Sequence, residues 1–292
     1  MTSAADRVPP PVLVLSGIVS VQFGGALAQT LIPALGAGGS VVMRLLFATG
    51  MLLVIVRPRW RGHSRRAWLT VIAFGMALGL MNYAFYGSLV HLPIGVAVTI
   101  EFIGPLALAA ALSRRLLDGA AVLAAGVGVV LISEAIGAPL AQLEWTGIGL
   151  ALAAGGFWAA YIVLSGRTGS EFPRLEGLAL AMVVATVVTL PFGITSVPDW
   201  SGPTIAKGLG IAVLSSVLPY SLELLALRRL SAQVFGILLS LEPACAALAG
   251  LIVLGQRLAP MQLLGMALVV GASAMVLGLG ARSKDPAQAA AT

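Results

Sequence analysis

Apolar segments long enough to cross a lipid bilayer fill most of this sequence. A helix needs about 20 apolar residues to span the hydrocarbon core, and the short connections leave no room for a soluble domain. The segments are too long for strands, and a membrane barrel would need alternating segments of about ten residues. The sequence therefore predicts an all-α membrane protein with ten transmembrane helices, at about 12–34, 39–56, 67–89, 93–113, 118–137, 145–166, 174–196, 204–227, 231–254 and 260–281.

Composition agrees with this class of protein. The chain is 59% hydrophobic and only 10% charged, whereas about 25% of a soluble domain is charged. Its 35 glycines suit closely packed membrane helices. The net charge of +6 does not predict a nucleic-acid partner, because the cations fall in separate loops and form no continuous basic face.

The loops predict the orientation through the positive-inside rule, by which Lys and Arg gather on the cytoplasmic side. With a cytoplasmic N-terminus, only Lys207 and Arg257 lie outside, and Arg44 lies within the second segment. We therefore expect both termini to be cytoplasmic. The cytoplasmic cations would be Arg7, Arg57, Arg59, Arg61, Arg65, Arg66, Arg114, Arg115, Arg167, Arg174, Arg228, Arg229, Arg282 and Lys284.

The chain also contains an internal repeat. The stretch LPIGVAVTIEFIGPLALAA, which begins at Leu92, resembles LSAQVFGILLSLEPACAALAG, which begins at Leu230. The same offset aligns Asn82 with Tyr220. We expect two five-helix halves, about 1–138 and 139–292. Because five is an odd number, the second half would cross the membrane in the opposite sense, as in secondary transporters with a central substrate site.

Two carboxylates interrupt the apolar segments near mid-membrane. Glu101 would lie roughly 12 Å inside the fourth helix and Glu242 roughly 16 Å inside the ninth. An ionised carboxylate at that depth is costly, so each should face a wet cavity, pair with a cation or carry a proton. Each could bind substrate, couple transport to protons or gate the pathway, and the alternative is a structural carboxylate.

Other residues could shape or gate the same region. Pro105, Pro219 and Pro243 could kink their helices, or only shape packing. Glu223 lies near the cytoplasmic end of the eighth segment. It could gate that mouth by pairing with Arg228 or Arg229, or be a solvated end residue.

Arg44 is placed near the outer end of the second segment and Glu134 near the outer end of the fifth. A structural ion pair between them is the preferred interpretation, with substrate contact as the alternative.

Aromatic and amide side chains share faces of two predicted helices. Asn82 and Tyr86 are four residues apart, and Trp158 and Tyr161 are three apart. With Tyr220 they could line a pocket for a small amphiphile. The competing interpretation is an interfacial position of the aromatic rings at the membrane surface.

The sequence lacks the motifs of the main enzyme and pump classes. It has no HExxH, no GxxxxGK[ST] and no GxSxG. Two histidines and one cysteine make no credible transition-metal cluster. We therefore expect no cofactor, no metal and no enzymatic activity.

Several stretches resemble the drug/metabolite transporter superfamily in its EamA-type branch. They are MRLLFA at 43–48, EFIGPLAL at 101–108, LPYSLELLALRRL at 218–230 and LSLEPACAALAGLIVLGQRL at 239–258. The last three are most similar to threonine/homoserine exporters of the RhtA type, and amino-acid exporters of the YddG type are a second candidate. One departure is that Gln22 and Phe23 occupy the first helix, where many EamA repeats carry a tryptophan.

The resemblance implies export of amino acids across a bacterial inner membrane, driven by protons, through a central cavity between the halves. Its motif residues map to Glu101, Pro105, Pro219, Glu223, Glu242 and Pro243. We therefore expect an amino-acid exporter that works by alternating access. The alternatives are an exporter of another small metabolite or drug, a passive channel and an intramembrane enzyme.

Overall fold

The structure is a computed structural model of the 292-residue chain. It describes residues 8–112, 116–132, 144–230, 232–239, 241–255, 259–261, 263–265, 267–268 and 270–271. These residues form helices, joined by short turns and loops, and the part of the chain so described contains no strand.

The first half of the chain begins with three long helices. They are followed by a pair of shorter helices and by one further helix that packs against that pair. In order the helices are α1 Pro10–Gln29, α2 Ile32–Val56, α3 Arg65–Ser88, α4 Ile94–Glu101, α5 Ile103–Leu112 and α6 Leu116–Ile132.

The second half repeats the pattern of long helices followed by a broken one. Its elements are α7 Trp145–Glu171, α8 Glu176–Gly193, the 3-10 segment η3 Ile194–Asp199, α9 Gly202–Ala212, the π-helical segment η4 Val213–Val217, α10 Leu218–Leu227, α11 Ala232–Leu239 and α12 Glu242–Leu254. The predicted tenth segment, at 260–281, lies largely outside the described residues.

Among the described residues, six helical stretches are long and apolar enough to cross a membrane. They are Pro10–Gln29, Ile32–Val56, Arg65–Ser88, Trp145–Glu171, Glu176–Asp199 and Gly202–Leu227, and the shorter stretches Ile94–Pro105 and Glu242–Leu254 are also apolar. The protein is therefore an all-helical, multi-pass membrane protein. The count of ten spans remains a prediction.

The boundary between the first two helices differs from the prediction. Helix α1 ends at Gln29 and α2 begins at Ile32, so the loop expected near 35–38 lies inside α2. The chain bends there at Gly36, whose φ of 69° is in the left-handed region. Glycine adopts that conformation without a Cβ clash, which lets the chain turn without ending the apolar run.

Each of the three predicted helix-kink prolines follows an irregular turn in its helix. Pro105 follows the break at Phe102, Pro219 follows η4, and Pro243 follows the break at Leu241. Proline lacks the backbone N–H that would bond to the carbonyl four residues earlier, and its ring crowds that carbonyl. The irregular turns therefore lie where the proline chemistry favours them.

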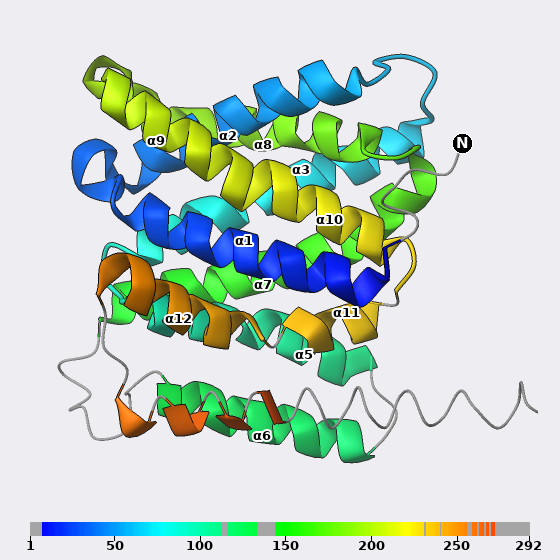
Figure 1. Ribbon diagram of the computed structural model, residues 1–292. Helices are drawn as coiled ribbons and strands as arrows, with labels where there is room; N and C mark the ends of the chain where they lie inside the picture. Colours follow the sequence, from blue (N-terminus) through cyan, green and yellow to red (C-terminus); the bar gives the residue numbers. More distant parts are fainter. Residues whose placement is uncertain are drawn as a thin grey trace, which may run out of the picture.

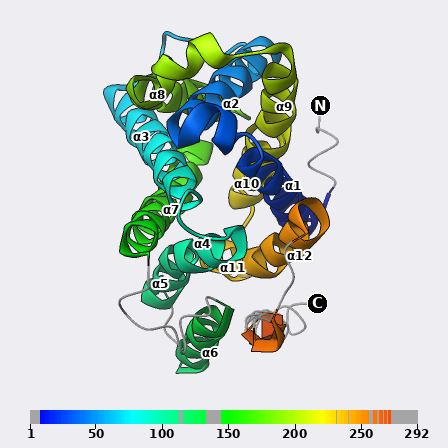
Figure 2. The same ribbon diagram turned by 90° about the vertical axis from the view of Figure 1, so that its left-hand side faces the viewer.

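Figures 1 and 2 show a bundle in which the helices run side by side, with α6 at one edge beside α5. Helix α3 packs along α7 and α8, and α2 packs along α8. A Cβ on Gly75 or Gly79 would press on the α8 backbone at Ala181 or Ala185. These two glycines therefore allow the close helix approach that their four-residue spacing indicates.

Candidate functional site

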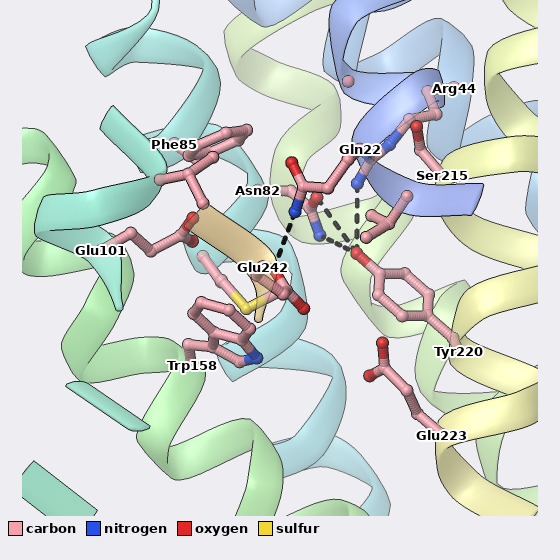
Figure 3. Close-up of a pocket in the computed structure, with 14 residues that line it drawn as sticks. Gln22, Arg44, Asn82, Phe85, Glu101, Trp158, Ser215, Tyr220, Glu223 and Glu242 are labelled. Atoms are coloured by element: carbon pink, nitrogen blue, oxygen red, sulfur yellow. Dashed lines mark hydrogen bonds between the residues drawn. The ribbon is translucent and has the colours of Figure 1, made fainter. Parts of the chain in front are cut away.

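A polar cavity of about 60 Å³ lies inside this apolar bundle (Figure 3). Helices from both halves of the chain form its wall, and most of its wall residues are polar or aromatic. The lining residues are Val21, Gln22, Gly25, Arg44, Met81, Asn82, Phe85, Val98, Glu101, Trp158, Ser215, Tyr220, Glu223 and Glu242.

Three glutamates line the cavity and all three are buried. Glu101 is the last residue of α4, Glu223 lies in α10 and Glu242 is the first residue of α12. Their exposed fractions are 7%, 4% and 5% respectively. The cavity therefore concentrates carboxylates in a region where an uncompensated charge is expensive.

The three carboxylates have different hydrogen-bond partners. The side-chain amide of Gln22 donates to Glu242 Oε2 at 2.9 Å, and the Tyr161 hydroxyl donates to Glu223 Oε2 at 2.7 Å. No described residue donates a hydrogen bond to the side chain of Glu101. Of the three glutamates, Glu101 is thus the one whose side chain receives no hydrogen bond from a described residue.

A hydrogen-bonded cluster of Arg44, Tyr86, Tyr220 and Asn82 forms another part of the wall. Arg44 donates from Nη1 to the Tyr86 hydroxyl and from Nη2 to the Tyr220 hydroxyl, each at 3.2 Å. Its guanidinium carbon lies 5.0 Å from the centre of the Tyr86 ring. The cluster fixes the buried guanidinium beside the cavity.

Asn82 and Tyr220, which the repeat aligns with each other, touch directly. Asn82 Nδ2 donates to the Tyr220 hydroxyl at 2.9 Å, and that hydroxyl lies 3.2 Å from Asn82 Oδ1. The two residues are separated by 138 positions, the offset read from the sequence. If a twofold axis relates the two halves, it passes near this contact, because residues in equivalent positions of a repeat can touch each other only close to the axis.

The structure brings most of the predicted site residues to this one place. Asn82, Glu101, Trp158 and Tyr220 line the cavity with Glu223 and Glu242. Tyr86 and Tyr161 lie one shell behind, where each is hydrogen-bonded to a residue of the wall. Trp158 is 6% exposed, so its ring faces the bundle interior and not the membrane surface.

Two sequence interpretations need correction. Glu223 is not a solvated end residue, because it is buried beside Tyr161. Arg44 was placed near the outer end of its segment, but its side chain is only 3% exposed and lines the cavity inside the bundle.

The predicted ion pairs remain open. Glu134 lies outside the described residues, so its pairing with Arg44 stays a prediction. The prediction that Glu223 gates the cytoplasmic mouth by pairing with Arg228 or Arg229 also stays a prediction. The carbonyl of Phe172 accepts a hydrogen bond from Arg228 at 2.6 Å, and that of Val8 accepts one from Arg229 at 2.8 Å.

Two polar wall residues were not assigned to the site from the sequence. Gln22 holds Glu242, and Ser215 belongs to η4 with a buried hydroxyl that has no hydrogen-bond partner among the described residues. A lone amide in the middle of an apolar segment was the available signal for Gln22. Ser215 had a weaker signal, because serine is common in membrane helices.

The wall of the cavity carries charges of both signs. Among the described residues there is no group of three or more His, Cys, Asp or Glu able to hold a metal ion. Carboxylates and a guanidinium lie in the same small space and can attract opposite charges of one ligand. The site can therefore bind a small polar molecule that carries both charges.

Comparison with known proteins places the chain in a transporter family. The model of the EamA-like transporter family matches residues 145–278. The threonine/homoserine exporter RhtA of Escherichia coli (strain K12) is 39% identical over 267 residues, which cover 90% of each chain. The protein of the same name from Salmonella typhimurium (strain LT2) is 38% identical over the same length.

A solved crystal structure shows the same fold. It aligns with a TM-score of 0.69 over 94% of this chain and 99% of that chain, at 20% sequence identity. With relatives 38–39% identical over nine tenths of the sequence, the chain belongs to the EamA-like transporter family of the drug/metabolite transporter superfamily, and it is a membrane transporter, not an enzyme.

Proposed function

We propose that the protein is a secondary active exporter of threonine, homoserine and related amino acids across a bacterial inner membrane. The observation that carries this proposal is the buried cavity, in which Glu101, Glu223 and Glu242 face the same space as Arg44. A zwitterionic amino acid needs both charges compensated when it leaves water. The similarity to exporters that bear this substrate in their name supports the same substrate class here.

Transport would use ten transmembrane helices arranged as two inverted five-helix halves, 1–138 and 139–292. The packing pattern supports this arrangement. Helix α7 packs on α3 and on α4 and α5, while α1 packs on the repeat-related elements α9, α10 and α12. Helix α4 packs on α12 and α5 on α11, so the two broken helices lie antiparallel, as an inversion requires.

The two halves would move against each other around the cavity in an alternating-access cycle. Support comes from the wall, to which both halves contribute. Gln22, Arg44, Asn82 and Glu101 belong to the first half, whereas Trp158, Tyr220 and Glu242 belong to the second. A relative movement of the halves would therefore change the site itself and couple binding to access.

Glu101 would exchange a proton during the cycle, or bind the ammonium group of the substrate. Its burial and the lack of a hydrogen-bond donor from any described residue support this role. A carboxylate in this position is neutral when it carries a proton and becomes a site for a cation when it loses the proton. Glu223 and Glu242 would contribute to coupling or gating through their contacts with Tyr161 and Gln22.

Both termini would lie in the cytoplasm. Reporter fusions after Arg66, Arg115 and Lys284 should score cytoplasmic, and fusions after His91 and Asp199 should score external. A cytoplasmic score at Asp199 would overturn the ten-helix count.

The substrate class can be tested with the purified protein in liposomes. The liposomes are preloaded with labelled threonine and challenged externally with other amino acids one at a time. We expect saturable counterflow with threonine and homoserine. Exchange of other metabolites but of no amino acid would refute the substrate class, and flux that neither saturates nor shows counterflow would indicate a channel.

A further inference from the structure

We propose that Arg44, held by Tyr86 and Tyr220, binds the α-carboxylate of the exported substrate. This inference rests on the proposed amino-acid substrate and adds the group by which the site recognises it. The sequence favoured a structural ion pair for Arg44, with substrate contact as the alternative. The structure places its guanidinium in the cavity wall, which supports the alternative.

The first argument is that Arg44 forms no ion pair with any carboxylate of the described residues. Arg44 is 3% exposed, and its Nε has no hydrogen-bond partner. No carboxylate oxygen of a described residue lies within 4.0 Å of its guanidinium nitrogens. A buried cation without an anion is strongly unfavourable, so a ligand that supplies a carboxylate would relieve that cost each time it binds.

The second argument is the way the guanidinium is fixed. One N–H of each terminal nitrogen bonds to a tyrosine hydroxyl, and the guanidinium carbon lies over the Tyr86 ring, 5.0 Å from its centre. Asn82 in turn holds the Tyr220 hydroxyl. The hydroxyl partners orient the guanidinium without neutralising its charge. Each terminal nitrogen keeps a second N–H, and these two groups could donate to the two oxygens of a carboxylate.

The third argument is the distribution of charge across the cavity. In Figure 3, Glu101 approaches from the side occupied by α4 and Trp158, while Arg44 lies on the other side near Ser215 and Tyr220. Glu242 lies between them, at the start of α12. A zwitterion would fit such a site in one orientation, with its carboxylate toward Arg44 and its ammonium toward Glu101 and Glu242.

This assignment makes a statement about specificity. Molecules that keep the ammonium and hydroxyl groups of threonine but lack a carboxylate would leave Arg44 uncompensated. Such analogues include threoninamide and 1-amino-2-propanol. A site whose buried polar groups are left unpaired discriminates strongly against the analogue that lacks the matching group.

The test is an equilibrium titration of the purified protein in detergent with threonine and, separately, with threoninamide. For the wild type we expect threoninamide to bind at least tenfold more weakly than threonine. Arg44→Gln should weaken threonine at least tenfold and leave threoninamide within twofold. Arg44→Lys keeps the charge but loses the two-pronged geometry, so we expect it to restore part of the preference for threonine.

The control variant is Arg66→Gln, because the side chain of Arg66 is 90% exposed and lies outside the cavity. It should leave both affinities unchanged. If Arg44→Gln does not fold, the carboxylate site is tested by Arg44→Lys and by the ratio of the wild-type affinities for threonine and threoninamide. Equal affinities in the wild type, or equal weakening of both ligands in an Arg44 variant, would overturn the carboxylate site.

The outcomes separate this inference from the proposed function. Wild-type protein that binds and exchanges no amino acid contradicts the function and the carboxylate site together. Wild-type protein that binds threonine, with an Arg44 variant that shows no selective loss for the carboxylate, contradicts only the carboxylate site.

Discussion

The two broken helices of the bundle present their glutamates in different surroundings. Glu101 ends α4, just before the break at Phe102, and receives no hydrogen bond from a described side chain. Glu242 begins α12, just after the break at Leu241, and accepts a hydrogen bond from Gln22. Glu101 therefore lies before the break in its helix, whereas Glu242 lies after the break in its own.

The two glutamates differ in the partners that the protein supplies. The start of a helix offers unpaired backbone N–H groups and a partial positive charge, and the end offers the reverse. Glu242 lies at the start of α12 and accepts a hydrogen bond from the Gln22 amide. Glu101 has neither partner, and we therefore propose that Glu101 carries the exchanged proton and that Glu242 has a structural or gating role.

The largest expected effect comes from Glu101→Gln. Glutamine keeps the size of the side chain and its hydrogen-bonding capacity but cannot ionise. Threonine export driven by a pH gradient in liposomes should fall at least tenfold, while threonine–threonine exchange should stay within about threefold of the wild type, because only proton coupling is lost. Both rates are measured at matched protein levels between pH 6 and 8.

The matched variant is Glu242→Gln, in which an amide can still accept the hydrogen bond from Gln22. We expect it to retain at least a third of the gradient-driven export. Equal rates for Glu101→Gln and the wild type would remove Glu101 from the mechanism. A larger loss for Glu242→Gln than for Glu101→Gln would reverse our assignment of the two carboxylates.

The second effect concerns the support of Glu242. Gln22→Leu removes the amide donor and should lower the free energy of unfolding by about 1–3 kcal/mol, the cost of a buried acceptor left without a partner. The loss is followed as a lower unfolding midpoint in detergent. We also measure the double variant Gln22→Leu with Glu242→Leu. It should lose less free energy of unfolding than the two single variants lose together, because removing both partners leaves no unpaired polar group behind.

If the losses of unfolding free energy in the two single variants simply add up in the double variant, the Gln22–Glu242 contact contributes nothing to stability. The result for Glu242 can be compared with Glu101, at the end of α4. Because no described residue donates to Glu101, no single donor removal is expected to produce a comparable loss there.

The sequence predicted the general architecture better than the site contacts. Apolar length predicted the helices, because hydrocarbon thickness fixes how many residues a span needs. The 138-residue offset predicted that Asn82 and Tyr220 are related, and the two side chains are hydrogen-bonded. Depth along the helix predicted that Glu101 and Glu242 are interior, and both line the cavity.

Side-chain partners could not be read in the same way. The surroundings of Arg44 depend on Tyr86 and Tyr220, which come from two other helices. The difference between Glu101 and Glu242 depends on which side of a helix break each lies, and Gln22 comes to Glu242 from a residue 220 positions away. Such contacts follow from packing between distant segments, which local patterns do not specify.

The third and smallest effect concerns Glu223, the remaining carboxylate of the cavity. Tyr161→Phe removes its hydroxyl donor and should cost about 1 kcal/mol of stability. We expect threonine exchange to fall by about two- to fivefold, because Glu223 remains in place but is less well held. Unfolding midpoints and exchange rates in liposomes measure the two effects.

Tyr83→Phe is the control for this variant. Tyr83 lies on α3, outside the cavity, and its ring stacks on Phe192 at 4.3 Å. Phenylalanine preserves that stacking, so exchange should stay within experimental error of the wild type. A loss in Tyr83→Phe equal to that in Tyr161→Phe would mean that the Tyr161–Glu223 bond has no special role.

The most direct test of the central claim is a measurement of proton movement itself. Liposomes that contain the protein and a pH-sensitive dye, with the membrane potential clamped, receive an inward threonine gradient and no pH gradient. We expect the interior of wild-type and Glu242→Gln liposomes to become more alkaline as protons leave in exchange for threonine. Glu101→Gln liposomes should show no pH change, although they should take up labelled threonine by exchange when they are preloaded with unlabelled threonine. The same alkalinisation in Glu101→Gln as in the wild type would contradict the assignment of the exchanged proton to Glu101.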